Sequence, residues 1–175
     1  VLSLAKLNLN TFEISPEKKL QDTKQLISKA INDLRNLSRS MHGDRIAELG
    51  LQQSLTDELQ ILENSGEFKT GMKITGSQYK LPPQKEMVLF RIVQEALNNA
   101  IKHAKAKNIN LLLDYKPGLF TLTVTDDGNG FDSTLVRNGI GLKSMRNRAQ
   151  LIGGSCNLQS SVGDGTSITI ELPNP

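Results

Sequence analysis

The sequence of 175 residues lacks the features that mark membrane-spanning, secreted and disulfide-bonded proteins. No apolar run approaches the roughly 18–20 residues of a membrane-spanning helix, and no signal peptide is visible. The single cysteine, Cys156, excludes an internal disulfide and suits a reducing compartment. Because Cys156 alternates with Leu158 in a strand-like stretch, we expect its thiol to be buried.

Aromatic residues and blocks of like charge are also scarce. Aromatics make up 4% of the chain, and the net charge of +3 is spread over interspersed acids and bases. We therefore expect no direct binding of nucleic acid. The phosphate-binding loop G-x-x-x-x-G-K-[ST] and the dinucleotide fingerprint G-x-G-x-x-G are both missing, so neither common nucleotide motif is available.

The chain divides near residues 43–50 into a helical part and a mixed part. We expect a helical hairpin over residues 1–47 and an α/β domain over residues 48–175. Residues 1–9 resemble the end of an apolar-faced helix, and the Ser-Pro pair at residues 15–16 predicts a new helix start. Because the first residue is not Met, we also expect a piece of a longer protein, with or without a membrane anchor elsewhere.

A seven-residue spacing runs along the second helix of this hairpin. One set of positions holds Leu20, Ile27, Leu34 and Met41, and three residues after the first three come Thr23, Ala30 and Leu37. Such a seam is typical of a coiled coil or a four-helix bundle. It suits either a helix packed on its own domain or a dimerisation bundle, and we favour the bundle because the hairpin is too small to fold alone.

The second part mixes helices with paired strands. A first helix is expected to end at Gly66, and the order after it is strand, helix, two strands, helix, two strands. Pro117 and Gly118 join the first strand pair, and "GDG" joins the last. This order predicts an α/β sandwich with a mixed, mainly antiparallel sheet, and it disfavours a doubly wound nucleotide fold.

The central helix of this domain carries an unusual polar stretch, "EALNNAIKHA". Its apolar face is predicted to contain Leu89, Val93, Ala96, Leu97, Ala100, Ile101 and Ala104. On the other side Glu95, Asn99 and Lys102 form one line, with His103 at its edge. A solvated face would explain charged residues but would seldom use two asparagines. A carboxylate, a carboxamide and an ammonium instead suit a metal ion with phosphate.

A second unusual stretch, "TLTVTDDGNGF", places an acid on the apolar side of a strand. Strand alternation predicts that Asp126 shares a face with Phe120 and Val124. A buried carboxylate needs hydrogen-bond donors, and the amino group of adenine would be one. Gly128 and Gly130 would allow a close approach of the backbone to the base. A tight Asp-Gly turn would explain the glycines but not the inward acid.

Two further stretches suit the same ligand. In "NGIGLKSM", Gly139 and Gly141 open a helix whose free amides could bind an anion. In "GDGTSITIEL", Thr166 is in register with apolar strand residues, so its inward hydroxyl needs a partner. Together the four stretches predict a site for an adenine nucleotide with Mg²⁺.

These stretches resemble the sequence boxes of the GHKL ATPase family, in the same order and spacing. "EALNNAIKHA" is similar to the N box, "DDGNGF" and "GIGL" to the glycine boxes, and "GDGT" to the terminal Gly-Thr motif. The "KHA" ending and the short segment between Phe131 and Gly139 resemble the sensor histidine kinases that pair with NarL-type response regulators. The resemblance implies the Bergerat fold with helices on one face, ATP and Mg²⁺ as ligands, and homodimers formed by the N-terminal helices. It also implies the cytosolic part of a bacterial sensor.

The resemblance assigns roles by position. Asn99 would bind Mg²⁺, Asp126 would bind the adenine amino group, and Thr166 would support the base. Lys102 and His103 would lie toward the phosphates, and Glu95 would orient or activate the phosphoryl acceptor or a water. The pocket and its lid would be shaped by Gly128, Gly130, Gly139, Gly141 and Leu142.

The chain departs from this family in its histidines. It has two, His42 and His103, and neither matches the phosphoacceptor histidine followed by an acid on the first dimerisation helix. We therefore expect the acceptor upstream of Val1. Other readings are an ATP-driven clamp, a serine kinase, and a nucleotide-binding interaction module or ATPase without histidine kinase activity. The dimerisation-like helix argues against the first two, and the intact motifs argue against an inactive module.

Overall fold

The computed structural model describes residues 16–132 and 140–173, and most side chains before Ile46 lie outside this description. The chain forms two compact units, Val1–Arg45 and Ile46–Pro175. The helix expected within residues 1–9 lies outside the described residues. That the first unit is part of a dimerisation hairpin therefore stays a prediction.

Helix α2 (Pro16–Asn64) begins at the expected proline and is interrupted at Gly50, whose backbone is not helical (φ 77°, ψ 170°). In the first unit the seam residues Leu20 and Ile27 are 58% and 44% exposed, while Leu34 and Met41 lie outside the described side chains. Apolar side chains exposed at seam spacing leave a surface that a partner helix could cover. Past Gly50, α2 ends two residues before Gly66, as expected.

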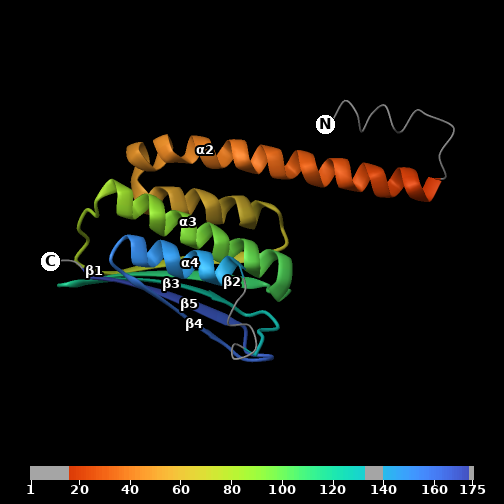
Figure 1. Cartoon of the computed structure of the whole chain (residues 1–175). Helices are drawn as coiled ribbons and strands as arrows, with labels where there is room; N and C mark the ends of the chain where they lie inside the picture. Colours follow the sequence, from red (N-terminus) through yellow and green to blue (C-terminus); the bar gives the residue numbers. More distant parts are fainter. Residues whose placement is uncertain (1–15, 133–139, 174–175) are drawn as a thin grey trace. The chain divides into compact units, whose positions relative to one another are not determined.

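The second unit contains a five-stranded sheet in the order β1-β2-β3-β5-β4 (Figure 1). The strands are β1 (Lys69–Gly76), β2 (Asn108–Lys116), β3 (Leu119–Asp126), β4 (Ser155–Ser160) and β5 (Thr166–Pro173). β1 pairs with β2 in parallel, and the other three pairings are antiparallel. The mixed, mainly antiparallel sheet is therefore confirmed, as are the two hairpins.

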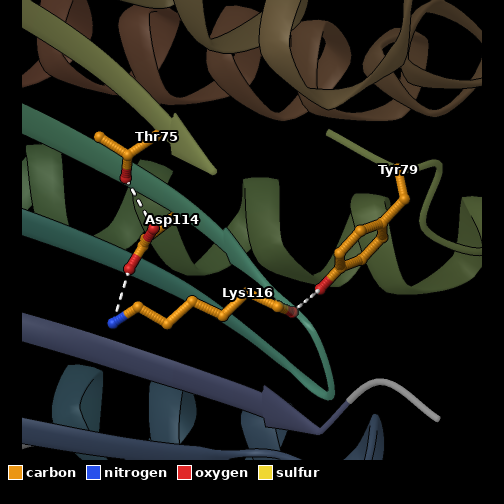
Figure 2. Close-up of polar contacts among 4 residues, drawn as sticks. All are labelled: Thr75, Tyr79, Asp114 and Lys116. Atoms are coloured by element: carbon orange, nitrogen blue, oxygen red, sulfur yellow. Dashed lines mark hydrogen bonds and ion pairs between the residues drawn. The ribbon is translucent and has the colours of Figure 1, made fainter. Parts of the chain in front are cut away.

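A cluster of side chains on β1 and β2 ties the parallel pair together at its end (Figure 2). The Thr75 hydroxyl donates to Asp114 at 2.7 Å, and the Lys116 ammonium lies 2.9 Å from the other oxygen of the same carboxylate. Figure 2 also shows Tyr79 donating to the carbonyl oxygen of Lys116. Hydrogen bonds from Thr75 and Lys116 lower the pKa of Asp114, because both donors favour the ionised carboxylate.

Helices α3 (Pro83–Asn99) and α4 (Ile140–Leu151), with the part of α2 after Gly50, cover one face of this sheet (Figure 1). Each contributes an apolar stripe at helical spacing, such as Leu51, Leu55 and Leu59 in α2. The alternate residues of β2 and β3 that face the helices are fully buried: Ile109, Leu111, Leu113, Phe120, Leu122 and Val124. The expected sandwich with helices on one face is confirmed.

The helix that carries "EALNNAIKHA" does not stay regular to its end. α3 passes into a π-helical turn, η1 (Ala100–Ala104), and the chain leaves it through Lys105 in a left-handed conformation (φ 53°). A π turn bonds residue i to i+5 and so holds more residues than an α turn. The prediction that Ile101 lies on the buried face is therefore wrong: the side chain is 37% exposed, whereas Ala100 and Ala104 are buried as expected.

Candidate functional site

A cavity of about 440 Å³ lies where α3, η1 and the start of α4 meet the ends of β3, β4 and β5. It is lined by Ala96, Asn99, Ala100, His103, Ala104, Asp126, Gly130, Phe131, Gly141, Leu142, Leu158, Thr166 and Ile168. The fold thus brings together seven of the residues assigned from the resemblance, from four separate stretches of sequence. This volume is of the size that ligand pockets have, roughly 300–1,000 Å³.

Asp126 provides the acid of this cavity. It is the last residue of β3 and lies opposite Thr166 of β5 in the sheet register. Its carboxylate accepts a hydrogen bond from the Gly128 N–H at 2.9 Å. Thr166, on the facing strand, also acts to lower the pKa of Asp126 through its backbone N–H and hydroxyl. Burial nevertheless raises the pKa of Asp126, because desolvation outweighs these donors. A partly desolvated carboxylate on an apolar wall is a strong acceptor for an N–H donor of a ligand.

The glycines after Asp126 are required by contacts between segments of the protein itself. A Cβ at Gly128 would lie 2.4 Å from the carbonyl oxygen of Ala104, and one at Gly130 (φ 55°) would lie 1.9 Å from that of Ser161. Hydrogen bonds hold the same loop, since Asn129 N–H donates to Ala104. Gly130 lines the cavity, but Gly128 packs beside it. That these glycines admit a base stays a prediction.

Asp127, next to the acid of the cavity, has the opposite environment. It is exposed, and its carboxylate accepts hydrogen bonds from the backbone N–H groups of Lys107 and Asn108, both at 2.8 Å. A third comes from the Asn108 side chain. These donors lower the pKa of Asp127 to about 2. Asp127 fixes the loop after η1 to the end of β3, a role that the sequence prediction did not include.

The polar line of the central helix is only partly at the cavity. Asn99 and His103 line it. Glu95 is half-buried, and its carboxylate reaches the start of α4. A Cβ added at Gly141 would lie 2.6 Å from the Glu95 carboxylate oxygen and 3.6 Å from the amide nitrogen of Asn99. Lys102 is exposed and does not line the cavity. Past Asn99 the π turn changes the spacing on which the predicted line of three depends. The roles of these residues stay predictions.

The start of α4 contributes the remaining wall. Gly141 and Leu142, in its first turn, line the cavity, while Gly139 lies outside the described residues. The first backbone N–H groups of a helix have no partner within it and carry partial positive charge. The beginning of α4 is therefore suited to an anionic group of a ligand.

Three lining residues were not among the predicted site residues: Phe131, Leu158 and Ile168. The lining alanines, Ala96, Ala100 and Ala104, were predicted only as part of the apolar face of the helix. Strand alternation could have identified Leu158 and Ile168, since each is two residues from a predicted inward position. Cys156, in the same strand, is half-buried, where a buried thiol was expected, and burial raises its pKa. Phe131 ends the "DDGNGF" stretch, but no role was predicted for its side chain.

Within residues 16–132 and 140–173 no group of three or more His, Cys, Asp or Glu side chains could hold a metal ion by itself. Across the same part of the chain, no helix is both long and apolar enough to cross a membrane.

A mixed sheet covered on one face, with a half-buried acid and a helix start sharing one cavity, defines a nucleotide-binding ATPase domain. The model of the Histidine kinase-, DNA gyrase B-, and HSP90-like ATPase family matches residues 84–175. The chain belongs to this family, and membership implies ATP binding. The resemblance drawn from the sequence boxes is confirmed.

The curated relatives are sensor histidine kinases. The chain is 29% identical over 157 residues to the signal transduction histidine-protein kinase/phosphatase DegS of Brevibacillus brevis, covering 89% of this chain and 41% of that protein. It is 30% identical over 150 residues to the oxygen sensor histidine kinase NreB of Staphylococcus carnosus, covering 85% and 43%. The chain therefore spans about two fifths of the length of these relatives.

Solved histidine kinases share the fold. The histidine kinase domain of a blue-light activated kinase from Erythrobacter litoralis superposes with a TM-score of 0.59 and 23% identity, covering 71% of this chain and 59% of that one. The mycobacterial sensor histidine kinase MprB gives a TM-score of 0.52 and 22% identity, covering 70% and 91%. At this identity the likeness shows the fold.

Proposed function

We propose that this chain contains the ATP-binding catalytic domain of a two-component sensor histidine kinase. It would transfer the γ-phosphoryl group of ATP to a histidine, from which a NarL-type response regulator would receive it. The parent protein would be a homodimer joined through its N-terminal helices. The observation that carries the proposal is the half-buried Asp126 carboxylate in a cavity that also holds Asn99 and the start of α4.

The residues divide into those for the base and those for the phosphates. Asp126 would accept the amino group of adenine, and Thr166 would support this contact from the facing strand. Apolar walls at Leu158 and Ile168 would exclude water from the base. At the other end the free amides near Gly141 would meet the phosphates.

Asn99 fits a magnesium ion by its chemistry. Its amide oxygen is the kind of ligand that Mg²⁺ prefers, and one or two protein ligands suffice where phosphates complete the shell. Bound Mg²⁺ would neutralise charge on the phosphates. The chain itself would position the nucleotide and keep His103 and Lys102 near the phosphate end, while Glu95 would orient the acceptor.

Thermal unfolding with and without Mg·ATP tests the binding half of this proposal. At 100 times its Kd a ligand stabilises the folded state by about 2.7 kcal/mol, so we expect a clear rise in Tm. No rise with Mg·ATP would favour an interaction module that keeps the fold without the activity.

Labelling with radioactive ATP tests the acceptor. Neither histidine has the sequence context of the phosphorylated residue, so we expect no acid-labile phosphate on His42 or His103. Acid-labile label on His42 would contradict this assignment.

A further inference from the structure

β4 is an edge strand of the sheet, and it lacks the features that usually protect such an edge (Figure 1). Among the described strands it pairs with β5 and with no other. An unpaired edge presents N–H and C=O groups to which another strand can bond, and charged residues or proline normally prevent this. β4, "SCNLQS", contains no charged residue and no proline. On the face without helices its side chains Ser155, Asn157 and Gln159 are exposed.

The opposite edge of the sheet is built differently. β1 carries two exposed lysines, Lys69 and Lys73, and two glycines, Gly71 and Gly76. Like charges repel an approaching copy of the same strand, and glycine weakens strand pairing. Of the two edges, β4 is therefore the one that can accept another strand.

Two exposed apolar side chains lie at the two ends of β4. Leu151, four residues before the strand, is 81% exposed, and Val162, two residues after it, is 77% exposed. Among the side chains that the structure describes, these are the most exposed of the large apolar ones. A partner that lies along β4 would remove both from water, which favours association.

We propose that β4 pairs with β4 of a second copy of this chain, antiparallel and centred on Asn157. Directly opposite residues of an antiparallel pair share a face of the sheet. A two-fold axis at Asn157 therefore places this residue opposite itself and Ser155 opposite Gln159 of the second copy. Residues 155–159 of the six-residue strand are then paired. The two Asn157 side chains each donate and accept, so they can bond to each other across the axis.

The apolar ends favour a second copy of the chain over an unrelated strand. Leu151 comes six residues before Asn157 and Val162 five residues after it, so this pairing brings Leu151 of each copy beside Val162 of the other. One contact thus covers four exposed apolar side chains, and no like charges meet along the strands. A centre at Cys156 pairs residues 155–157 alone, and a centre at Leu158 moves the apolar ends apart.

This contact is distinct from the proposed homodimer through the N-terminal helices. β4 belongs to the second compact unit, Ile46–Pro175, whereas the exposed seam residues Leu20 and Ile27 belong to the first. Asn157, at the axis, does not line the nucleotide cavity. The contact therefore goes beyond the proposed function and stands whether or not the chain binds ATP.

Disulfide cross-linking tests the register of this pairing. In a Cys156→Ser background, which removes the native thiol, a cysteine is introduced by Asn157→Cys or, as the matched control, by Ser155→Cys. Both positions are exposed on the same face of β4. In the proposed pairing the two Cα atoms at position 157 lie about 4.5–5.5 Å apart, within the range of a disulfide. Those at position 155 are offset by four residues, roughly 13 Å, which is beyond that range.

Under mild oxidation without nucleotide, we expect Asn157→Cys to form covalent dimers about tenfold faster than Ser155→Cys or more, because only its thiols are within reach. Both proteins are also made with Leu20→Lys and Ile27→Lys, which weaken any association through the helical seam, and the difference should remain. Equal rates in the two proteins, or no covalent dimer from Asn157→Cys, would overturn the proposal. Neither result would affect the proposed nucleotide function.

Sedimentation velocity of the seam variant tests the same contact without a covalent bond. Asn157→Lys places like charges opposite each other at the axis, so the dissociation constant of the dimer should rise about threefold or more. Leu151→Lys should act in the same direction. The control, Asn110→Lys, adds the same charge to an exposed position of the inner strand β2 and should change nothing.

A seam variant that stays monomeric at every concentration would contradict the edge contact, and so would equal weakening by Asn157→Lys and Asn110→Lys. If Asn157→Lys does not unfold cooperatively on heating, Leu151→Lys decides, and unchanged association in that variant overturns the proposal.

Discussion

Two adjacent carboxylates, Asp126 and Asp127, allow a test in which one substitution is the control for the other. Burial raises the pKa of Asp126, whereas backbone donors lower that of Asp127 to about 2. Asp126→Asn and Asp127→Asn each remove one negative charge from the same loop. We expect the first to abolish tight ATP binding and the second to affect mainly the stability of the fold.

The magnitude for Asp126→Asn follows from its donors. An Asn side chain accepts through one oxygen and donates through its amide nitrogen. If that oxygen stays on the Gly128 N–H, the amide nitrogen faces the donors of Thr166 and the amino group of the base. Losing a hydrogen bond to a charged acceptor costs about 1.5–3 kcal/mol, and an unpaired donor about 1–3 kcal/mol more. The lower limits together predict roughly 60-fold weaker ATP binding or more.

For the free energy of unfolding we expect the opposite ranking, with a larger loss in Asp127→Asn than in Asp126→Asn. At neutral pH the charge of Asp126 is disfavoured by burial, so its removal offsets part of the lost hydrogen bonding, and we expect a small change in unfolding free energy. Asp127→Asn weakens contacts to Lys107 and Asn108 that hold the loop after η1. These contacts are exposed, so the loss should be about 1 kcal/mol or less.

The assays are calorimetric titration with Mg·ATP and urea unfolding of all three proteins. ATP binding by Asp126→Asn within about threefold of the original chain would refute the assignment of this carboxylate to the base. So would an equal loss of binding in both variants, because the loss would then follow from a disturbed loop.

Three further predictions concern the same cavity. Asn99→Asp should weaken Mg·ATP binding at least tenfold, because a new negative charge repels the phosphates, and the midpoint of urea unfolding should not change. Unchanged calorimetric titrations would contradict the proposed position of Asn99 near the phosphates. Gly141→Ala should lower the free energy of unfolding in urea by less than about 1 kcal/mol, since the colliding atom is the end of the flexible Glu95 side chain. Gly165→Ala should lower it by about 3 kcal/mol or more, because φ is 74° there and the added Cβ would lie 2.0 Å from the Asp126 carbonyl oxygen. Similar losses in the two variants would refute this reasoning. ATP affinity should fall on acidification as pH drops through the raised pKa of Asp126, because the protonated acid no longer accepts the amino group, and in Asp126→Asn this pH dependence should disappear.

The strands and their inward residues could be predicted because alternation is a strong signal where one face is buried. Phe120, Leu122 and Val124 are all buried, and the same parity brought Asp126 to the cavity. Thr166 followed from the identical argument on β5. The order of hairpins and helices then sufficed for the fold class, because every break except the one before β2 was marked by glycine or proline.

The end of the central helix could not be predicted in the same way. An argument from 100° per residue assumes an α-helix throughout, and it fails at Ala100, where the π turn begins. It therefore placed Ile101 in the core, whereas this side chain is 37% exposed. The hydrogen bonds that join the Ser160 hydroxyl to the Phe131 N–H and the Gly165 carbonyl oxygen were not predicted either. They depend on which loops meet in the fold and not on any local sequence pattern.

The π turn and the glycine loop after β3 contact each other through Ala104. The end of the turn directs the Ala104 carbonyl to the Asn129 N–H, at 2.7 Å, and brings Ala104 against Gly128. A Cβ at residue 128 would lie 2.5 Å from that of Ala104, so the close approach requires a glycine there. The "KHA" ending and the "DGNG" loop, which the sequence presents as separate motifs, are thus two sides of one contact. This contact lies between the helix that carries Asn99 and the strand end that carries Asp126, so its geometry sets the spacing of these two lining residues.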